Sequence, residues 1–204
     1  MRSIPGRGSA SAPGVDTNML TAQDVFVRNA AGTDADAIAA IGSEAMPAQY
    51  AGLVDPAAVA AVVSQVYEPS AVTECIDRCQ RASDALFLVA ERSGQVVGFL
   101  HFDSFGPEPE LHRLYLELRH RGAGIGTLLM NGLHTRLPEE LAYMLLVVAG
   151  NDRAVRFYER HGLHVSRLVD GLTYYSQRMG VVFPPGTRPV GLVLMRRTVA
   201  GQHG

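Results

Sequence analysis

A glycine-rich turn between an apolar strand and an amphipathic helix has the clearest chemical meaning in this sequence. The turn is Arg121-Gly122-Ala123-Gly124-Ile125-Gly126, and Thr127 follows it. Leucines recur at strand spacing before the turn and at helical spacing after it. A turn that opens a helix presents free backbone N–H groups at the positive end of the helix dipole, and glycine lets the backbone approach a ligand closely. The turn therefore predicts a binding site for a phosphate or pyrophosphate.

Spacing distinguishes three kinds of phosphate-binding loop. A Walker loop has Lys and then Ser or Thr after its last glycine, whereas here Thr127 follows Gly126 directly. A dinucleotide-binding fingerprint has a third glycine three positions after the second, where this chain has Leu129. The remaining pattern, Arg-x-x-Gly-x-Gly, is similar to the pyrophosphate loop of GNAT-type N-acetyltransferases. An ordinary glycine-rich turn without a ligand is the alternative that this hexapeptide alone leaves open.

A second block, residues 151–162, strengthens the resemblance. Its sequence is Asn-Asp-Arg-Ala-Val-Arg-Phe-Tyr-Glu-Arg-His-Gly, and it follows the strand-like residues 142–149. It resembles the other GNAT signature, which has Asn, then Ala three positions on, then Phe-Tyr, and a Gly that closes the helix. Asn151 or Asp152 can cap the helix start, and Gly162 suits the left-handed residue that ends it. Asn151 and Tyr158 lie two turns apart and so project from one face.

The resemblance implies that acetyl-CoA binds as a co-substrate and that no metal is needed. It places the pyrophosphate on residues 121–127 and the pantetheine arm along the end of the preceding strand. The cofactor-binding residues that it implies are Leu114, Tyr115, Leu116, Arg121, Gly122, Ala123, Gly124, Ile125, Gly126, Thr127, Asn151 and Tyr158.

The implied reaction moves acetyl directly from the thioester to a primary amine, without a covalent enzyme intermediate. An alkyl ammonium has a pKa near ~10 and must lose a proton before it attacks, whereas the leaving thiolate benefits from gaining one. Tyr158 occupies the motif position of the general acid in many family members. The backbone N–H of Tyr115 or Leu116 would stabilise the developing oxyanion. The alternative role for Tyr158 is aromatic packing beside Phe157.

Glu110 is the predicted general base. It lies eleven residues before Arg121, where some protein-acetylating family members place a Glu that takes the amine proton, usually through water. His112 is the second candidate, because it shares the strand face and its intrinsic pKa is near neutral. A surface charge or a contact to a cationic substrate are the other roles left open for Glu110.

Composition sets the class of protein. A chain of 204 residues with 47% hydrophobic and 19% charged residues predicts one packed domain. A formal net charge of −2 does not indicate a basic surface that would bind nucleic acid or an anionic membrane. No apolar run approaches the ~18–20 residues of a membrane span, and the N-terminus lacks a secretory hydrophobic segment, so we expect a cytoplasmic protein. Cys75 and Cys79 lie four residues apart, a spacing that could supply half of a metal site; because no matching Cys/His pair lies nearby in the sequence, we expect two reduced core residues instead.

Periodicity and turn residues predict an α/β (α+β) domain at residues 24–198, with a mixed central sheet of about seven strands and helices on both faces. Residues 1–23 are predicted to be a disordered tail and residues 199–204 a second tail. We expect a loop at 47–56, a hairpin turn at 92–94, and irregular chain between the last two strands. The expected strands are 24–30, 84–91, 95–103, 111–118, 142–149, 163–169 and 190–198, and the expected helices are 33–46, 57–66, 71–81, 125–133 and 152–161.

The acceptor is left open by the sequence. Family members set specificity mainly with segments that correspond here to residues 46–67 and 172–188. A small-molecule or peptide amine is the expected partner, and a homodimer is one of the assemblies left open. A non-catalytic acyl-CoA sensor or interaction module on the same fold is the competing class of function, and a longer acyl chain is a further option.

Overall fold

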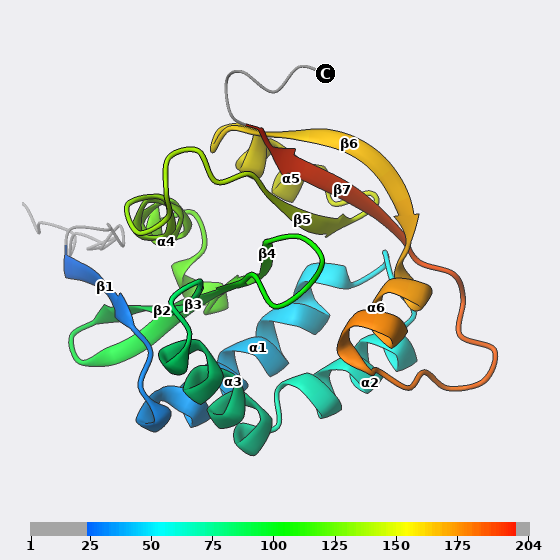
Figure 1. The fold of residues 1–204 in the computed structure, drawn as a ribbon. Helices are drawn as coiled ribbons and strands as arrows, with labels where there is room; N and C mark the ends of the chain where they lie inside the picture. The colour runs from blue at the N-terminus through cyan, green and yellow to red at the C-terminus, as the bar shows by residue number, and fades with distance from the viewer. Residues whose placement is uncertain (1–23, 199–204) are drawn as a thin grey trace, which may run out of the picture.

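A seven-stranded sheet forms the centre of the molecule (Figure 1). The computed structural model describes residues 24–198, and the two predicted tails lie outside the described residues. The strand order is β1-β2-β3-β4-β5-β7-β6, and all neighbours are antiparallel except β4 and β5, which run parallel. The strands are β1 (Val25–Asn29), β2 (Ala85–Arg92), β3 (Gln95–Asp103), β4 (Glu110–Leu116), β5 (Tyr143–Val148), β6 (Leu163–Asp170) and β7 (Gly191–Arg197). The predicted mixed sheet is confirmed.

Helices cover both faces of the sheet, as Figure 1 shows. On one face lie α1 (Ala35–Tyr50), α2 (Pro56–Val66), α3 (Pro69–Arg81) and α6 (Gly171–Met179). On the other lie α4 (Ile125–His134) and α5 (Asp152–Glu159). Short 3₁₀ segments occupy Gly32–Asp34 and Leu118–His120. Each face has its own buried cluster: Ile38, Ile76 and Phe99 belong to the α1–α3 side, and Leu129 and Met130 belong to the α4 side.

Capping and turn residues explain where several helices and strands begin or end. The Asn151 side chain accepts a hydrogen bond of 3.2 Å from the Ala154 N–H and so caps α5, and Gly162 has the left-handed φ of +83° predicted beyond the end of that helix. The β2–β3 hairpin turns at Ser93 and Gly94, whose φ values of 50° and 78° are those of a type I′ turn.

Two elements differ from the sequence prediction. The predicted loop at 47–56 is wrong in its first part, because α1 continues through Pro47 to Tyr50. Pro47 removes one hydrogen bond in the last helical turn, but burial of Met46 and Tyr50 in the core holds that turn in place. The predicted irregular chain before the last strand contains α6, which Asp170 caps by accepting a 3.0 Å hydrogen bond from the Thr173 N–H and which ends at Gly180 (φ 67°).

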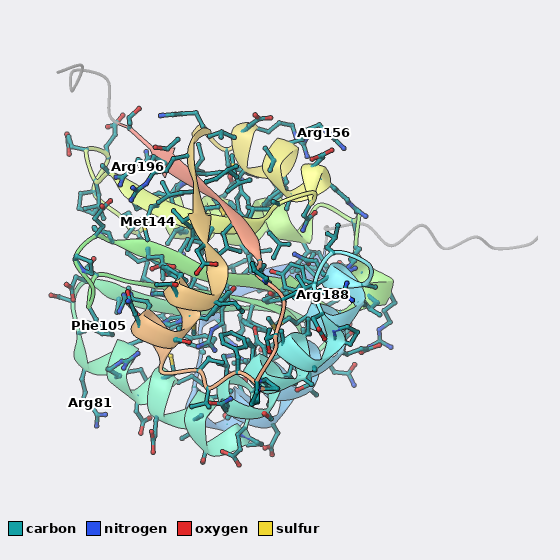
Figure 2. All side chains as sticks on the ribbon, turned by 90° about the vertical axis from the view of Figure 1, so that its right-hand side faces the viewer. Arg81, Phe105, Met144, Arg156, Arg188 and Arg196 are labelled. Carbon is teal, nitrogen blue, oxygen red and sulfur yellow. The ribbon has the colours of Figure 1, made fainter. Side chains whose placement is uncertain are left out.

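The C-terminal strands are fixed to the middle of the sheet. Met144 on β5 and Arg196 on β7 are register partners, and both are labelled in Figure 2. The Arg196 guanidinium also forms a two-pronged ion pair with Glu108, at 2.5 and 2.9 Å, in the connection between β3 and β4. Among the helices of residues 24–198, none is both long and apolar enough to cross a membrane.

Candidate active site

The parallel strands β4 and β5 separate soon after they meet. They pair only at Glu110–Met144 and Leu111–Leu145, although β4 continues to Leu116. The edge of β4 beyond Leu111 is therefore not used by β5. A strand edge with free backbone groups can accept an extended ligand as if it were another strand.

A β-bulge sets which side chains of β4 face which layer. The β3–β4 register passes from His101–Arg113 to Phe102–Leu111, which leaves His112 without a partner. The extra residue brings His112 and Arg113 to the same side. The residues on the α1–α3 side are Glu110, His112, Arg113 and Tyr115, and those that pack with the α4 cluster are Leu111, Leu114 and Leu116.

The glycine-rich turn opens α4 as the sequence predicts. Gly122 and Gly124 have φ values of 84° and 82°, a region that favours glycine, and Gly124 is the N-cap. The first helical N–H with a partner inside α4 belongs to Leu128, which donates to the Gly124 carbonyl at 3.2 Å. The three N–H groups before it have no acceptor within the helix and are directed toward its N-terminal end.

A cleft of about 450 Å³ opens beside this turn. Both sequence blocks line it, since one wall comes from β4 and the turn and the opposite wall comes from α5. Of the predicted cofactor-binding residues, the cleft is lined by Leu114, Leu116, Arg121, Gly122, Gly124, Gly126, Thr127, Asn151 and Tyr158. Ala48, Gln49, Arg153, Ala154, Phe157 and Arg160 also line it and were not predicted.

Three arginines give the cleft a cationic rim. Arg121 donates a hydrogen bond of 3.2 Å to the Ala45 carbonyl near the end of α1, which fixes its direction. Burial and the nearby charge of Arg153 lower the pKa of Arg121, but a guanidinium remains charged at neutral pH. Arg153 and Arg160 lie seven residues apart at α5, so helical spacing was the sequence signal that could have identified them.

Three predicted cofactor-binding residues do not line the cleft. The Tyr115 side chain faces the opposite layer, where its hydroxyl lies 3.0 Å from that of Tyr50. Ile125 is fully buried in the α4 core, and Ala123 packs against the same cluster. Only the backbones of these residues are available to a ligand in the cleft.

Strand alternation distinguishes the two N–H groups considered for the oxyanion. The Glu117 N–H donates to the Val97 carbonyl on the β3 side at 3.0 Å. Because backbone N–H groups alternate sides along a strand, the N–H of Leu116 is directed away from β3, toward the side where β5 has separated. Geometry therefore favours Leu116 over Tyr115.

Tyr158 presents its half-buried ring at the cleft from α5. Its ring packs edge-on against Phe157, with centroids 5.1 Å apart. Burial, with a smaller contribution from Tyr143, raises the pKa of Tyr158 well above its usual value. The hydroxyl therefore keeps its proton at neutral pH, which is the state a general acid requires.

Glu110 lies in a buried polar network on the α3 side. It is 3% exposed, and its Oε1 lies 3.3 Å from His112 Nδ1. The other ring nitrogen, His112 Nε2, lies 3.1 Å from Asp103 Oδ1 but is not aligned as a hydrogen bond. The two predicted candidates for the general base, Glu110 and His112, are therefore in contact, and His112 also contacts Asp103.

Helix α6 covers this network. The Tyr174 hydroxyl donates to Glu110 Oε1, and Arg178 Nε lies 3.6 Å from Glu110 Oε2. Burial alone would raise the pKa of Glu110, but His112, Tyr174 and Arg178 more than offset it and leave that pKa below its usual value. Burial would lower the pKa of His112, but the carboxylates of Asp103 and Glu110 raise it above its usual value.

The space between α1, α2 and α6 is nearly filled. Tyr50 and Tyr175 line it, and about 20 Å³ is available there, which is room for about one water molecule. Tyr50 and Tyr67 are buried in the core. An acceptor pocket on this side is therefore closed in the arrangement described.

Comparison with known proteins identifies the family of the chain and relatives of its fold. Residues 57–163 match the model of the acetyltransferase (GNAT) family. The chain belongs to this family, whose members are acyltransferases. A search of curated proteins finds no match.

Solved structures share the fold. The PaiA N-acetyltransferase from Thermoplasma acidophilum, in complex with coenzyme A, has a TM-score of 0.69 and 20% identity, over 86% of this chain and 99% of that chain. The ribosomal-protein-alanine N-acetyltransferase from Brucella melitensis has a TM-score of 0.64 and 22% identity, over 85% of this chain and 99% of that chain. Ard1 from Thermoplasma volcanium has a TM-score of 0.59 and 20% identity, over 86% and 98%. At these identities the likeness shows the fold alone.

Proposed function

We propose that this protein is an N-acetyltransferase that moves acetyl from acetyl-CoA to a primary amine of a small molecule, peptide or protein. One observation carries the proposal: the cleft beside the parted strands β4 and β5 is lined by both the glycine-rich turn and Tyr158. A binding loop and a proton donor thus face the same space. The family and its coenzyme A-bound fold relative support the same choice of co-substrate.

The residues of the cleft fit a pyrophosphate. The N–H groups of Ile125, Gly126 and Thr127 have no acceptor inside α4 and can bind phosphate oxygens. A Cβ added at Gly122 would meet no protein atom within 4 Å, so the turn has open space beside its backbone. The arginines of the rim, Arg121, Arg153 and Arg160, supply charge for an anionic ligand.

Acetyl-CoA supplies the activated thioester, and the chain's own groups act around it. The Leu116 N–H is placed to stabilise the negative charge that develops on the carbonyl oxygen when the amine attacks. The Tyr158 hydroxyl donates its proton to the departing thiolate sulfur. Packing against Phe157 holds the tyrosine ring in place for this transfer.

Glu110 receives the amine proton in our proposal. The carboxylate is ionised at neutral pH because its pKa is lowered, and it is buried beneath Tyr174. The proposed route for the proton runs through Tyr174: before the amine attacks, the Tyr174 oxygen accepts a proton from the acceptor's ammonium group while its own hydroxyl proton moves to Glu110 Oε1, which leaves a neutral amine as the nucleophile. His112 keeps the carboxylate oriented and is not free to act as the base itself, because its two carboxylate neighbours favour its protonated form.

Burial of Glu110 also favours a second candidate function. A carboxylate that is 3% exposed and covered by α6 suits a module that binds acyl-CoA without turning it over. The two functions predict different outcomes with the same reagent. An enzyme releases free thiol from acetyl-CoA when an acceptor is present, whereas a binding module does not.

The test combines calorimetry with a thiol-release assay. The full chain is titrated with acetyl-CoA and then incubated with a panel of amines: amino acids, polyamines, aminoglycosides and peptides with free N-termini or lysines. We expect saturable binding and thiol release with at least one acceptor class. Binding without release across the whole panel would overturn the enzyme assignment in favour of the binding module, and the absence of binding would overturn both.

A further inference from the structure

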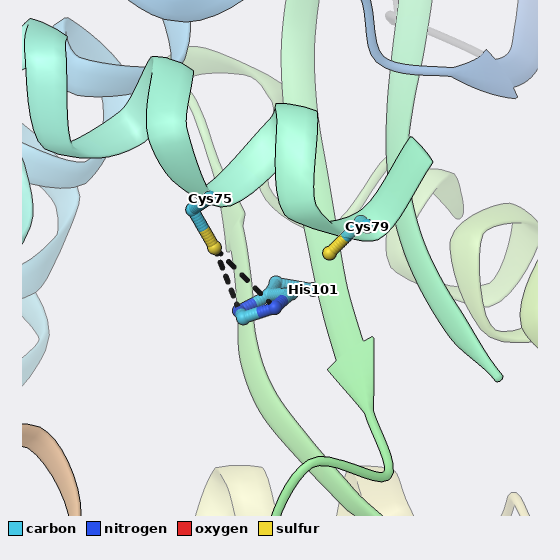
Figure 3. A group of neighbouring side chains, drawn as sticks. All are labelled: Cys75, Cys79 and His101. Carbon is cyan, nitrogen blue, oxygen red and sulfur yellow. Dashed lines mark hydrogen bonds between the residues drawn. The ribbon is translucent and has the colours of Figure 1, made fainter. Parts of the chain in front are cut away.

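Two cysteines and one histidine meet in the core behind the active-site network. Cys75 and Cys79 lie one turn apart on α3, and their thiols point toward the His101 ring on β3 (Figure 3). Cys75 Sγ lies 3.8 Å from His101 Nδ1 and 3.5 Å from Nε2. One ligand atom from each of the three residues lies within 4.8 Å of the others. The three residues are 8%, 4% and 2% exposed, respectively.

We propose that Cys75, Cys79 and His101 form a Zn²⁺-binding site. Tetrahedral zinc has Zn–S distances of about 2.3 Å and Zn–N distances of about 2.0–2.1 Å, which place sulfur about 3.6 Å from nitrogen and the two sulfurs about 3.8 Å apart. The observed S–N distance of 3.8 Å and the upper bound of 4.8 Å are close to this geometry. Shifts of about 1 Å or less in the three side chains would close the site around one ion.

Asp103 orients the histidine as carboxylates do behind metal sites. Asp103 Oδ2 lies 3.3 Å from His101 Nε2, which leaves Nδ1 for the metal. The imidazole is held between two rings: Phe87 stacks on it at 5.1 Å and His112 at 4.9 Å between centroids. Its orientation is therefore fixed before any ion binds, which reduces the cost of ordering the ligand.

Ligand chemistry selects the metal. Thiolate with imidazole favours zinc over magnesium or calcium, which prefer oxygen ligands. Zinc binding would displace the thiol protons of Cys75 and Cys79 into solvent and leave two thiolates and a neutral imidazole around Zn²⁺. Three protein ligands leave a fourth position, which a solvent molecule fills in zinc sites of this kind.

The charged groups around the site come from four elements. Arg78 on α3, Arg113 on β4 and Arg178 on α6 contribute positive charge, whereas Asp103 on β3 and Glu110 on β4 contribute negative charge. The two thiolates that zinc requires offset the nearby guanidinium groups. Zinc affinity should consequently fall at acidic pH, where protons compete for the thiolates.

An occupied site would join α3 to the sheet directly behind the predicted base. The chain of contacts runs from His101 through Asp103 to His112, and from there to Glu110. The sequence shows only half of this site, because His101 lies 26 residues beyond Cys75 and only the packing of the β2–β3 hairpin against α3 brings it near.

Cobalt spectroscopy of the full, reduced, metal-free chain tests the proposal. The sequence contains two cysteines, so a thiolate-to-cobalt charge-transfer band can arise from no other cysteine of the chain. We expect this band and tetrahedral d–d bands to saturate at one Co²⁺ per chain, and Zn²⁺ to abolish them by displacement. The Cys79→Ser variant should lose the charge-transfer intensity of one thiolate and bind at least tenfold more weakly. Replacement of the exposed His164 by Asn is the control for adventitious imidazole ligands and should change nothing.

Thermal unfolding gives an independent measurement. Zinc should raise the melting temperature of the wild-type chain more than that of Cys79→Ser, because stabilisation by a ligand grows with its affinity for the native state. A folded wild-type chain without a thiolate–cobalt band would overturn the proposal, even if Cys79→Ser failed to fold. So would a band that appears only in cobalt-bridged oligomers on gel filtration, or one that Cys79→Ser leaves unchanged.

Discussion

Gly124 gives the sharpest test of the glycine-rich turn. It has a φ of 82° as the N-cap of α4 and lines the cleft. Valine at this position would add a branched side chain beside the proposed pyrophosphate site and would force an L-residue into the left-handed region. We expect Gly124→Val to weaken acetyl-CoA binding while the fold survives.

The Gly124→Val change should reduce folding stability less than it reduces affinity for acetyl-CoA. The left-handed conformation costs an L-residue about 1–2 kcal/mol of folding free energy. For a domain of this size that corresponds to a fall in melting temperature of about 2–8 °C. Loss of two charge-assisted hydrogen bonds to phosphate, at about 1.5–3 kcal/mol each, weakens binding by roughly 3–6 kcal/mol. That is an affinity loss of at least about 100-fold.

Gly94→Val is the matched control. Gly94 has a nearly equal φ of 78°, an added Cβ there meets nothing within 4 Å, and the residue lies in the β2–β3 hairpin, outside the cleft lining. It should lose a similar amount of stability and keep wild-type affinity in calorimetry with acetyl-CoA. Unchanged affinity in folded Gly124→Val, or an equal loss in both variants, would refute the assignment of the turn.

Three further predictions concern Tyr158, Glu110 and the neighbouring His112. Tyr158→Phe should lower kcat about 100-fold with little change in acetyl-CoA affinity, because a hydroxyl acting as an acid contributes in the transition state; a wild-type kcat with chemistry rate-limiting would leave it only a packing role. Glu110→Gln should lower kcat at neutral pH and recover toward wild type at high pH, where the amine deprotonates unaided; an equal loss at every pH would indicate substrate binding instead. The raised pKa of His112 gives stability that is present below its unfolded pKa of about 6.5 and is lost as pH rises through the folded pKa, so denaturant titrations of His112→Asn should show a flatter decline on the alkaline side. The lowered pKa of Glu110 has the opposite effect: the stability that it gives is present above its unfolded pKa of about 4.3 and is lost as pH falls through the folded pKa. Identical dependence of stability on pH in the wild type and in His112→Asn would contradict the raised pKa of His112.

The parts of the site that sequence predicted are local in the chain. The turn before α4 and the cap of α5 are set by residues within a few positions of each other, such as Gly124 and Asn151. Their backbone requirements appear directly as residue types. The succession of strands and helices along the chain could be predicted because hydrophobic runs and turn residues alternate clearly over residues 84–149.

The parts that sequence did not predict depend on contacts between distant segments. Pro47 marked the end of a helix, but burial of Tyr50 carries α1 past it. The bulge at His112 is a property of β3 and β4 together, and it decides which side chains meet Glu110. Helix α6 has a local cap at Asp170, but its cover over Glu110 arises from tertiary packing.

A crystal structure of the protein with coenzyme A would show directly whether the cleft beside α4 holds the co-substrate. We expect the pyrophosphate to accept hydrogen bonds from backbone N–H groups of residues 124–127, and the pantetheine arm to lie along β4 at Leu114–Leu116, on the edge that β5 leaves free. The sulfur should end near the Tyr158 hydroxyl. A pyrophosphate bound away from the N-terminus of α4, or a sulfur on the far side of the sheet from Tyr158, would contradict this placement of the co-substrate.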